Sequence, residues 1–376
     1  MPAAIDPIAL LERLIACPSV TPAEAGAQAL LADVLASLGF EVHRFEAGEP
    51  PNGPVPNLLA VRGSGAPHFA FAGHTDVVPP GEGWATDPFV ATRRSGLIHG
   101  RGAVDMKGAL AAFVAAAARV RDHRGMLSLI ITGDEEGPAL NGTLALMDVM
   151  ASRALAPEMI LVGEPTSEAR LGDTIKIGRR GSVNIWITVT GRQAHVAYPH
   201  NGDNPITRAV RIGERLNAMP LDEGDDWFEP SNLEITTFDV GNRATNVIPG
   251  EASLRLNIRF NTHQRGSDLV ERVRAIVEEE APGAKVDVLL SGEAFFTEPG
   301  PLSAMVSAAV EEVTGIAPEF STGGGTSDAR YLHRLCPVVE FGLLNATMHK
   351  LDEAVAIADV ERLADIYEAV LRRAFA

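Results

Sequence analysis

Apolar residues in the first half of the chain recur with two alternating spacings, one typical of amphipathic helices and one of buried strands. The helical spacing covers residues 6–16, 22–38, 106–122 and 140–153, and the strand-like runs cover residues 41–46, 57–62, 68–72, 129–132 and 159–165. Strands that alternate with helices predict an α/β layer, with a largely parallel central sheet and helices on both faces.

The spacing changes near residue 178. Strand patterns at 182–191, 232–241, 251–260 and 285–296 now combine with helix patterns at 204–219 and 267–281. Their order, strand-helix-strand-strand-helix-strand, is that of a ferredoxin-like domain. A chain of 376 residues also exceeds what one ordinary core supports. We therefore expect an outer domain in two parts, 1–178 and 297–376, around an inserted domain, 179–296.

Composition narrows the classes of partner. The formal net charge of −17 argues against nucleic acid or an anionic membrane surface, because both require a basic footprint. Cys17 and Cys336 are the only cysteines, so a disulfide scaffold is excluded and a metal site would use His and carboxylate ligands. Residues 1–30 lack the pattern of a secretory signal, and no apolar run is long enough to span a bilayer. We therefore expect a cytoplasmic protein with no membrane partner.

Acidic and histidine residues follow several of the predicted strands. They are His74 and Asp76 in "FAFAGHTDVVP", Asp105 in "HGRGAVDMKG", Asp134, Glu135 and Glu136 in "ITGDEEG", Glu164 in "LVGEP", and His349 in "NATMHKLDE". In an open α/β sheet, ligands bind at the carboxyl ends of the strands. These side chains can therefore converge although they are far apart in the sequence.

Each residue also has a simpler interpretation. His74 alone could be a satisfied loop or core residue, Asp105 could cap the helix that follows it, and Glu164 could lie in a surface turn before Pro165. The acidic triplet could be a solvated turn. The simpler interpretations weaken together, because every one of these residues would have to fall at the same edge of one sheet by accident.

Two histidines and three carboxylates form the ligand set expected for two divalent cations, most naturally zinc. A bridging carboxylate lets two such ions lie about 3.5–4 Å apart. Asp76 is then expected to orient His74. Because neighbouring residues on an extended strand point to opposite sides, one of Glu135 and Glu136 can bind a metal while the other acts as a general base. The role of Asp134 stays open, with backbone capping or support of a ligand as the options considered.

Other catalytic templates are absent from the sequence. The chain has no G-x-S-x-G elbow and no H-E-x-x-H helix. Its glycine-rich segments "HGRGAVDMKG" and "STGGGTSD" lack the register of a P-loop and of the full dinucleotide fingerprint, which argues against nucleotide binding.

The motifs "GHTDVVP", "GRGAVDMKG", "GDEEG" and "GEP", in this order around an inserted ferredoxin-like domain, resemble the di-zinc deacylases and exopeptidases of the aminoacylase and glutamate-carboxypeptidase group. This resemblance implies that the outer domain is catalytic and the inserted domain serves as a lid and dimerisation domain. It implies that His74 and Glu164 hold one zinc, Glu136 and His349 hold the other, and Asp105 bridges both, with cobalt possible in one site. It further implies that Glu135 is the general base and that Asp76 orients His74.

A second set of motifs narrows the resemblance. The segments "GRRGSVN", "GRQAHVAYPH", "ATNVIPGE", "LNIRFN", "STGGGTSDAR" and "FGLLNATMHKLDE" resemble members of this group that hydrolyse N-succinyl-LL-2,6-diaminopimelate in diaminopimelate and lysine biosynthesis. On this resemblance His195 stabilises the oxyanion in the neighbouring subunit of a homodimer. The implied substrate contacts are Arg179, Ser182, Tyr198, Asn246, Arg259, Gly325 and Thr326.

The chain departs from this pattern in two places. It has Asp352-Glu353-Ala354 where the group often has Asn-Glu-Cys, and Ala329-Arg330-Tyr331 where the group often has Gly-Arg-Phe. The alternatives are a related deacylase, such as an acetylornithine deacetylase or a glutamate-releasing carboxypeptidase, and a catalytically silent metal-binding relative. We expect dimerisation through the inserted domain, because an exposed sheet edge can pair with its twin.

Overall fold

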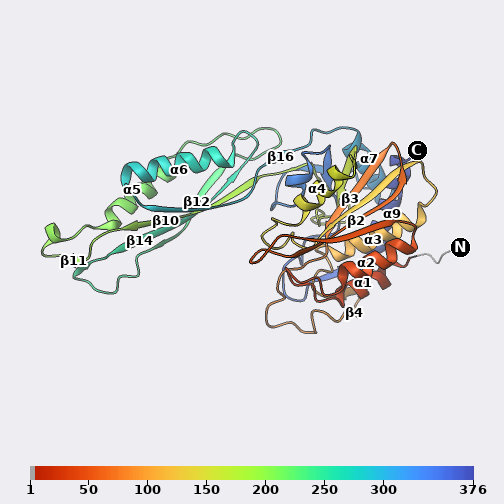
Figure 1. Cartoon of the computed structure of the whole chain (residues 1–376), viewed down its shortest axis with the longest axis horizontal. Helices are drawn as coiled ribbons and strands as arrows, with labels where there is room; N and C mark the ends of the chain where they lie inside the picture. Colours follow the sequence, from red (N-terminus) through yellow and green to blue (C-terminus); the bar gives the residue numbers. More distant parts are fainter. Residues whose placement is uncertain (1–4) are drawn as a thin grey trace. The chain divides into compact units, whose positions relative to one another are not determined.

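The computed structural model describes residues 5–376, which form two compact units (Figure 1). The first unit contains the chain up to Ile177 together with Thr297–Ser321 and Ser327–Ala376, and the second contains Gly178–Phe296 together with Thr322–Thr326. The predicted inserted domain, 179–296, omits the segment Thr322–Thr326. That segment packs with the second unit because Thr322 donates a hydrogen bond to the Trp227 carbonyl and the Gly323 carbonyl accepts one from Arg179.

The first unit is built on an eight-stranded sheet with the order β1-β2-β6-β3-β7-β18-β8-β17. Its strands are β1 (Glu41–Ala47), β2 (Val55–Ser64), β3 (His68–His74), β6 (Gly125–Thr132), β7 (Met159–Val162), β8 (Thr174–Lys176), β17 (Glu319–Ser321) and β18 (Val338–Glu340). The central neighbours β6, β3, β7 and β18 are parallel, whereas β1 and β2 add an antiparallel flank and β8 runs antiparallel to β18. The predicted α/β class with a parallel centre is confirmed.

The helices of the first unit are α1 (Pro7–Ile15), α2 (Ala27–Ser37), α3 (Lys107–Arg119), α4 (Thr143–Ser152), α7 (Pro301–Thr314), α8 (Ala329–Leu332) and α9 (Ile357–Ala374). Helices α1, α3, α7 and α9 pack together, while α4 packs against β2 and β6. The alanine-rich helix α3 is buried along most of its length, because its small side chains admit close neighbours. Phe71, Phe113 and Tyr367 form an aromatic cluster in this core, with the rings of Phe71 and Phe113 stacked 3.9 Å apart.

Shorter elements complete the first unit. Strands β4 (Thr92–Arg94), β5 (Leu97–His99) and β19 (Ala354–Ala356) form a three-stranded sheet with the order β19-β5-β4. These strands and β8 and β17 were not predicted, because three residues are too few to display a periodic pattern. The helix predicted for residues 22–38 begins only at Ala27. Gly26 before it has a left-handed φ of 89°, and the Glu24 carboxylate accepts the N–H groups of Gly26 and Ala29.

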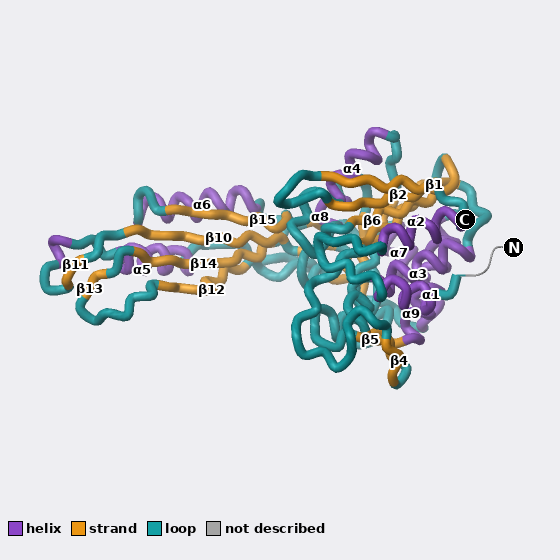
Figure 2. Tube along the Cα trace, turned by 60° about the horizontal axis from the view of Figure 1, so that its bottom comes forward, coloured by secondary structure: helices purple, strands orange, loops and turns teal. Residues whose placement is uncertain are grey.

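The second unit has the predicted ferredoxin-like order. Its main elements are β10 (Gly181–Thr190), α5 (Pro205–Asn217), β12 (Asn232–Asp239), β14 (Glu251–Phe260), α6 (Gly266–Glu280) and β15 (Lys285–Gly292). The strands form a four-stranded antiparallel sheet with the order β12-β14-β10-β15, and both helices pack on one face of it (Figure 2). Burial alternates along β14, so every second residue joins the core between sheet and helices.

Small elements lie at the ends of the second unit. They are β9 (Gly178–Arg179), β11 (Ala194–His195), the 3₁₀ helix η1 (Pro199–Asn201), β13 (Val247–Ile248) and β16 (Phe295–Phe296). The strand predicted for residues 285–296 is interrupted: β15 ends at Gly292, and β16 pairs with β9 instead.

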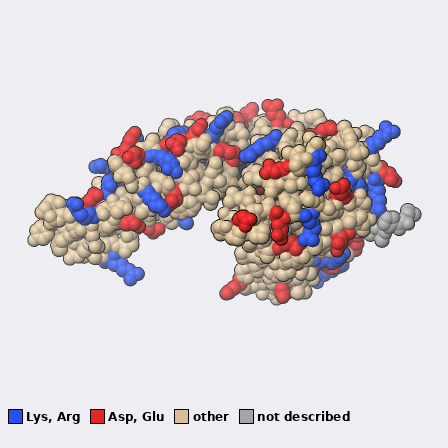
Figure 3. Space-filling model, in the orientation of Figure 1, with Lys and Arg blue, Asp and Glu red and all other residues tan. Residues whose placement is uncertain are grey.

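Charged side chains of both signs lie on the surface of the protein. On the face drawn in Figure 3, acidic and basic side chains are interspersed, and the described residues form no continuous basic patch there. Within residues 5–376, none of the helices combines the length and the apolar character that crossing a membrane requires.

Candidate metal centre

The predicted ligands of the first unit meet at the carboxyl ends of the parallel strands. His74 is the last residue of β3, Glu164 lies two residues beyond the end of β7, and Glu136 follows β6. His349 lies in the loop after β18, and Asp105 ends the turn that leads into α3. Because β6, β3, β7 and β18 are neighbours and run parallel, the sheet itself brings these loops to one edge.

His74, Asp105 and Glu164 form one group of donor atoms. The His74 Nε2 lies 3.1 Å from Asp105 Oδ1 and 3.7 Å from Glu164 Oε1, and the group's donor atoms all lie within 4.8 Å of one another. All three side chains are buried. Such an arrangement is compact enough for a single cation to contact all three residues.

Asp105, Glu136 and His349 form a second group. The His349 Nε2 lies 3.1 Å from Asp105 Oδ2 and 2.9 Å from Glu136 Oε1, again with all donor atoms within 4.8 Å. The two oxygens of Asp105 therefore face different groups: Oδ1 faces His74 and Oδ2 faces His349. This is the disposition that a carboxylate bridging two cations requires.

The charges within the two groups are strongly coupled. Hydrogen bonds and nearby carboxylates raise the pKa of His74 well above its usual value although burial opposes this. Asp105 and Glu136 raise the pKa of His349 to about 10. The two imidazoles in turn hold the pKa of Asp105 well below its usual range against the effect of burial. A site that concentrates three carboxylates around two imidazoles attracts positive charge, and its ligand chemistry suits zinc.

Asp76 organises this edge of the sheet in two ways. Its backbone carbonyl lies 2.9 Å from His74 Nδ1, which leaves Nε2 directed at Asp105. Its carboxylate, 3.6 Å from Nδ1, accepts the backbone N–H groups of Glu135 and Glu136 at 3.3 and 3.0 Å. The prediction that Asp76 orients His74 concerned the carboxylate, whereas the closer contact here is made by the main-chain oxygen.

Glu135 and Glu136 lie in a turn and not on an extended strand, since β6 ends at Thr132. The expectation that the two side chains project to opposite sides of an extended strand is therefore wrong, because the chain forms a turn here. Asp134 closes the turn: one carboxylate oxygen accepts the N–H groups of Leu140 and Asn141 at 3.0 and 3.3 Å. Of the two options considered for Asp134, the structure shows backbone capping.

Glu135 belongs to neither group of donor atoms. Burial, with Glu164 as the next largest influence, raises its pKa well above the usual value for a carboxyl group. A carboxyl group that belongs to neither donor group but is next to a ligand in the chain, and whose pKa is raised by burial, is a candidate proton acceptor and donor.

Sequence reasoning missed a buried polar cluster next to Glu135. Thr143 Oγ1 donates to Asp328 Oδ2 at 2.6 Å, and the Arg330 guanidinium lies 3.7 Å from Asp328 Oδ1 and 4.7 Å from the centre of the Tyr331 ring. Asp328 and Glu135 raise the pKa of Arg330 although burial lowers it. The only available signal was the "SDAR" segment itself, which contains an acid and an arginine but no periodic pattern.

The predicted substrate contacts all belong to the second unit, where they form two separate groups. One group contains Arg179, Ser182 and Arg259. Ser182 and Arg259 are paired across β10 and β14, and the Arg179 guanidinium donates to the Gly323 carbonyl at 3.4 Å. Burial and the neighbouring Arg180 lower the pKa of Arg259, which forms no ion pair with any residue in the range 5–376.

Gly325 and Thr326 lie in the segment that packs beside Arg179. A Cβ atom built on Gly325 would meet no atom within 4 Å, so the main chain here borders open space. Thr326 Oγ1 is shielded from solvent and has no hydrogen-bond partner among the described residues. A shielded hydroxyl of this kind is available to a ligand.

His195, Tyr198 and Asn246 form the other group. The rings of His195 and Tyr198 lie 5.9 Å apart, and the Asn246 carbonyl accepts the N–H of Val196. This group adjoins the Thr190 end of β10, whereas Ser182 lies at the other end. A strand of ten residues is about 30 Å long, so the structure does not bring the two groups together within one chain.

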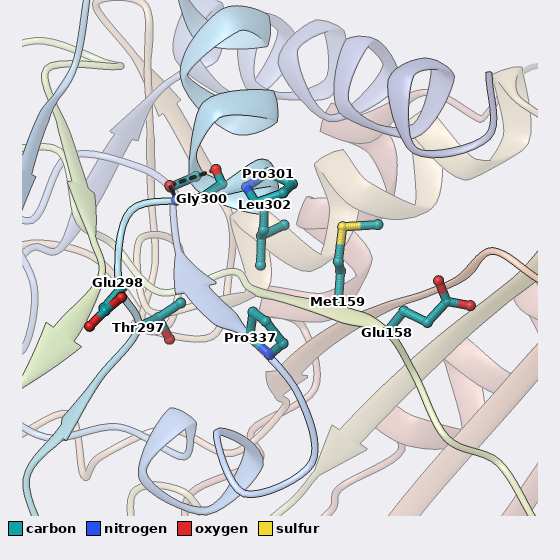
Figure 4. Close-up of a pocket in the computed structure, with 9 residues that line it drawn as sticks. Glu158, Met159, Thr297, Glu298, Gly300, Pro301, Leu302 and Pro337 are labelled. Carbon is teal, nitrogen blue, oxygen red and sulfur yellow. Dashed lines mark hydrogen bonds between the residues drawn. The ribbon is translucent and has the colours of Figure 1, made fainter.

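A separate hollow in the first unit contains none of the predicted site residues. Its volume is about 320 Å³, and its lining is formed by Glu158, Met159, Thr297, Glu298, Gly300, Pro301, Leu302, Ser303 and Pro337. In Figure 4, Met159, Leu302 and the rings of Pro301 and Pro337 surround it. Ser303, which also lines the hollow, is hydrogen-bonded to Gly300. Its walls are mainly apolar, and none of the residues of the two donor groups lines it.

Comparison with known proteins agrees with this geometry. Residues 70–373 match Peptidase family M20/M25/M40. Two of the most similar relatives, from Rhizorhabdus wittichii and Sphingopyxis alaskensis, are named succinyl-diaminopimelate desuccinylase. They are 66% and 61% identical to this chain over 372 residues, which covers 99% of this chain and 99% of each relative.

Solved structures share the fold at low sequence identity. A metallo-carboxypeptidase of the M20 family from Sulfolobus solfataricus superposes with a TM-score of 0.81 at 16% identity, covering 98% of this chain and 99% of that chain. The YXEP protein from Bacillus subtilis, described as a dinuclear metal binding peptidase, has a TM-score of 0.70 at 16% identity and covers 98% of both chains. With the family match over most of its length and relatives above 60% identity, the chain belongs to peptidase family M20/M25/M40.

Proposed function

We propose that this protein hydrolyses N-succinyl-LL-2,6-diaminopimelate to succinate and LL-2,6-diaminopimelate, a step in diaminopimelate and lysine biosynthesis. The relatives named succinyl-diaminopimelate desuccinylase cover 96–99% of this chain at 52–66% identity. The observation that carries the chemistry is the pair of Asp105 oxygens, each directed at a different group of donor atoms. The alternative of a catalytically silent relative is disfavoured, because the chain has an acidic residue, Glu135, next to the ligand Glu136 that belongs to neither group of donor atoms.

Two zinc ions would be held by the two groups, the first by His74 and Glu164 and the second by Glu136 and His349. Asp105 would serve both ions. Cobalt would be accepted in one of the two positions, since imidazole and carboxylate ligands also suit it. When bound, the pair of cations polarises the amide carbonyl and lowers the pKa of water.

Glu135 would move the proton. It takes one proton from the water whose oxygen forms a bond to the amide carbon, and it returns that proton to the amide nitrogen as the carbon–nitrogen bond breaks. The remaining proton of the carboxylic acid passes to the amine, so the products are a carboxylate and an ammonium group, and one water is consumed for each amide. Its surroundings support this role, because burial and Glu164 raise its pKa and so favour the protonated form that it adopts between the two steps.

Two arginines would recognise the carboxylates of the substrate. Arg179 and Arg259 lie at the same end of the second unit, near Ser182, Gly325 and Thr326. Arg259 is half-buried beside the like charge of Arg180 and without an acidic partner in residues 5–376, so a carboxylate from outside the chain would relieve the repulsion. Guanidinium groups bind carboxylates in a bidentate manner.

His195 would act in a homodimer, where it donates a hydrogen bond to the oxyanion in the active site of the partner chain. The support is the separation of about 30 Å along β10 between the His195 group and the Arg259 group, which a single site could not span. Tyr198 and Asn246 would contact the substrate from the same side. The edge strand β12 of the second unit offers unpaired main-chain groups for the dimer. The chain would work in the cytoplasm with no nucleic acid or membrane partner.

The decisive experiment compares substrates at defined metal content. Protein loaded with two equivalents of zinc should release succinate from N-succinyl-LL-2,6-diaminopimelate at least 100-fold faster than it releases acetate from N-acetylornithine. Faster deacetylation would assign the chain to a related deacylase. Bound zinc with no hydrolysis of either compound would instead support a silent metal-binding relative.

A further inference from the structure

Glu353 is a buried acidic residue that the proposed chemistry does not use. It lies four residues after His349, in the segment where the chain departs from the group's usual pattern, and its side chain is 0% exposed. A buried carboxylate is stable only when hydrogen-bond donors or a cation compensate for the loss of water.

The Glu353 carboxylate has four such donors, and three of them are main-chain groups of one turn. Its Oε1 accepts the N–H groups of Val104 and Asp105 at 2.8 and 3.2 Å. Its Oε2 accepts the N–H of Gly102 at 3.1 Å and the Arg101 guanidinium at 2.8 Å. The turn before α3 is thus held by a side chain from a segment some 250 residues later in the sequence.

Main-chain contacts reinforce this link. The Glu353 carbonyl accepts the N–H of Gly100 at 2.9 Å, so the side chain and the main chain of the same residue both hold the turn. Gly102 has a φ of +82°, and a Cβ on it would lie 2.6 Å from Val77, so only glycine fits this position. Arg101 is 2% exposed, and its guanidinium also donates to the Pro80 carbonyl. The guanidinium is thus fixed beside the Glu353 carboxylate and balances its negative charge.

The other end of the link is the loop that carries His349. Thr347 Oγ1 donates to the Ala354 carbonyl at 2.8 Å and accepts the Ala354 N–H at 3.2 Å, which closes the loop around His349 and Glu353. His349 itself has a left-handed φ of 60°. Glu353 therefore joins the loop of one proposed ligand, His349, to the turn of another, Asp105.

We propose that Glu353 is a positioning residue that sets the distance between Asp105 and His349 before any cation binds. The proposal rests on the dinuclear site described under the proposed function. His74 and Glu164 stand at or just beyond the ends of central strands, so the first site keeps two firmly placed ligands without Glu353. Both sites use Asp105, but only the second site uses His349, which lies in the loop that Glu353 joins to the Asp105 turn, so loss of Glu353 should weaken the second site selectively.

The test is a zinc titration of the metal-free protein by calorimetry, with Glu353→Gln beside the wild type. The amide group of Gln places an N–H donor either against the N–H groups of Val104 and Asp105 or against the N–H of Gly102 and the Arg101 guanidinium. We expect the affinity for the second zinc to fall about 10- to 100-fold, as is typical when a residue supporting a ligand is replaced. The affinity for the first zinc should change less than threefold.

Asp173→Asn is the matched control. The Asp173 carboxylate also holds a turn of the first unit, through the N–H groups of Glu168, Ala169 and Arg170 at 2.9, 2.8 and 2.8 Å, but that turn carries no proposed ligand. This variant should lower the melting temperature and bind both zinc ions as the wild type does. Wild-type affinity for the second zinc in Glu353→Gln, or an equal loss of both sites in the two variants, would overturn the proposal.

A measurement on the wild type covers the case in which Glu353→Gln does not fold. In the metal-free protein, the amide hydrogens of Gly102, Val104 and Asp105 should exchange slowly, because Glu353 accepts all three. Protection that appears only after zinc is added would overturn the proposal. Failure of the proposed function is distinguishable, since it would appear as a wild type that binds fewer than two zinc ions or releases no succinate, whatever the exchange rates.

Discussion

In the first unit the residues proposed for chemistry are mostly buried and touch one another, whereas in the second unit they are spread over two ends of one sheet. His74, Asp105 and Glu164 are at most 8% exposed, and the two groups of donor atoms share Asp105. In the second unit, Tyr198 is 58% exposed and is separated along β10 from Arg259.

The difference follows from what each unit must bind. A pair of cations needs ligands within a few ångströms, and parallel strand ends supported by buried hydrogen bonds hold them there. In the proposed homodimer the second unit supplies Arg259 to one active site and His195 to the active site of the partner chain, and a long antiparallel strand keeps these two groups apart. Four changes would test this division of labour, from the largest expected effect to the smallest.

Glu135→Gln should abolish turnover and leave the metal centre intact. We expect kcat to fall about 100- to 10,000-fold, as for the loss of a general base. Zinc content should remain at two ions per chain, because Glu135 belongs to neither group of donor atoms. The matched variant Glu136→Gln should lose zinc as well as activity. A Glu135→Gln variant that retains a tenth of the wild-type kcat would show that Glu135 is not the general base.

Leu256→Ala should destabilise the second unit without changing the metal centre. Leu256 is 0% exposed and lies between Ile185 and Ile235 in the antiparallel sheet. Loss of such a side chain costs about 2–5 kcal/mol of unfolding free energy. Urea unfolding followed by tryptophan fluorescence measures it, since Trp186 and Trp227 both lie in this unit.

Zinc stoichiometry separates the two cores in this experiment. The folded Leu256→Ala variant should still bind two zinc ions under native conditions. Leu127→Ala, at an equally buried position of β6 in the first unit, provides the contrasting variant and should weaken zinc binding. If Leu256→Ala lowered the zinc stoichiometry and Leu127→Ala did not, the metal centre would depend on the second unit. Metal binding could then not be assigned to the first unit alone.

Arg259→Ala should weaken substrate binding more than turnover. A hydrogen bond to a charged group contributes about 1.5–3 kcal/mol, so we expect kcat/KM to fall about 10- to 100-fold, mainly through a higher KM. Arg255→Ala on the same strand is the control, because Arg255 is exposed and donates to Thr236. Equal effects of the two substitutions on kcat/KM would show that Arg259 acts only through the overall positive charge of the surface and does not bind the substrate directly.

Asp222→Asn should give the smallest effect, and one that depends on pH. Asp222 Oδ1 accepts the N–H groups of Gly224 and Ser231 and the side-chain amide of Asn261, and despite some burial these bonds lower the pKa of Asp222 to about 2. An unfolded Asp titrates near pH 3.9, so the wild-type advantage is complete above about pH 4 and is lost as the pH falls toward 2.

The size of this effect is limited by solvent. Asp222 is partly exposed, so solvent screens its ionised contacts, and we expect less than about 1 kcal/mol from them. Urea unfolding of wild type and Asp222→Asn at pH 6 and pH 3 measures the difference. The difference in unfolding free energy between the two proteins should be smaller at pH 3 than at pH 6. A larger difference at pH 3 would contradict a stabilising role of the ionised Asp222.

Periodic patterns predicted the long elements well because each pattern repeats several times. The sheet order of the second unit and the convergence of His74, Asp105 and Glu164 followed from strands such as β3 and β14. Short strands such as β8 and β17 carry no repeat, and the late start of α2 depends on a left-handed Gly26 and on the Glu24 side chain. These features are decided by single hydrogen bonds, which periodicity does not detect.

Long-range polar contacts were also beyond sequence reasoning. Glu353 is separated by about 250 residues from the turn it holds, and Asp328 reaches Thr143 across 185 residues. The main-chain carbonyl of Asp76 contacts His74 where the carboxylate was expected, because the carboxylate instead holds the turn of Glu135 and Glu136. The sequence predicted that Asp76 supports His74. It could not show that the main-chain oxygen contacts His74 while the carboxylate oxygens accept the N–H groups of Glu135 and Glu136.

The central claim is that Asp105 is shared by two metal sites. Zinc titration of the metal-free wild type and of Asp105→Asn, with succinate release measured on the same samples, tests it most directly. We predict two zinc ions per chain and hydrolysis for the wild type, and for Asp105→Asn no more than one tightly bound zinc and no hydrolysis. An Asp105→Asn protein that binds two zinc ions with wild-type affinity would contradict the account.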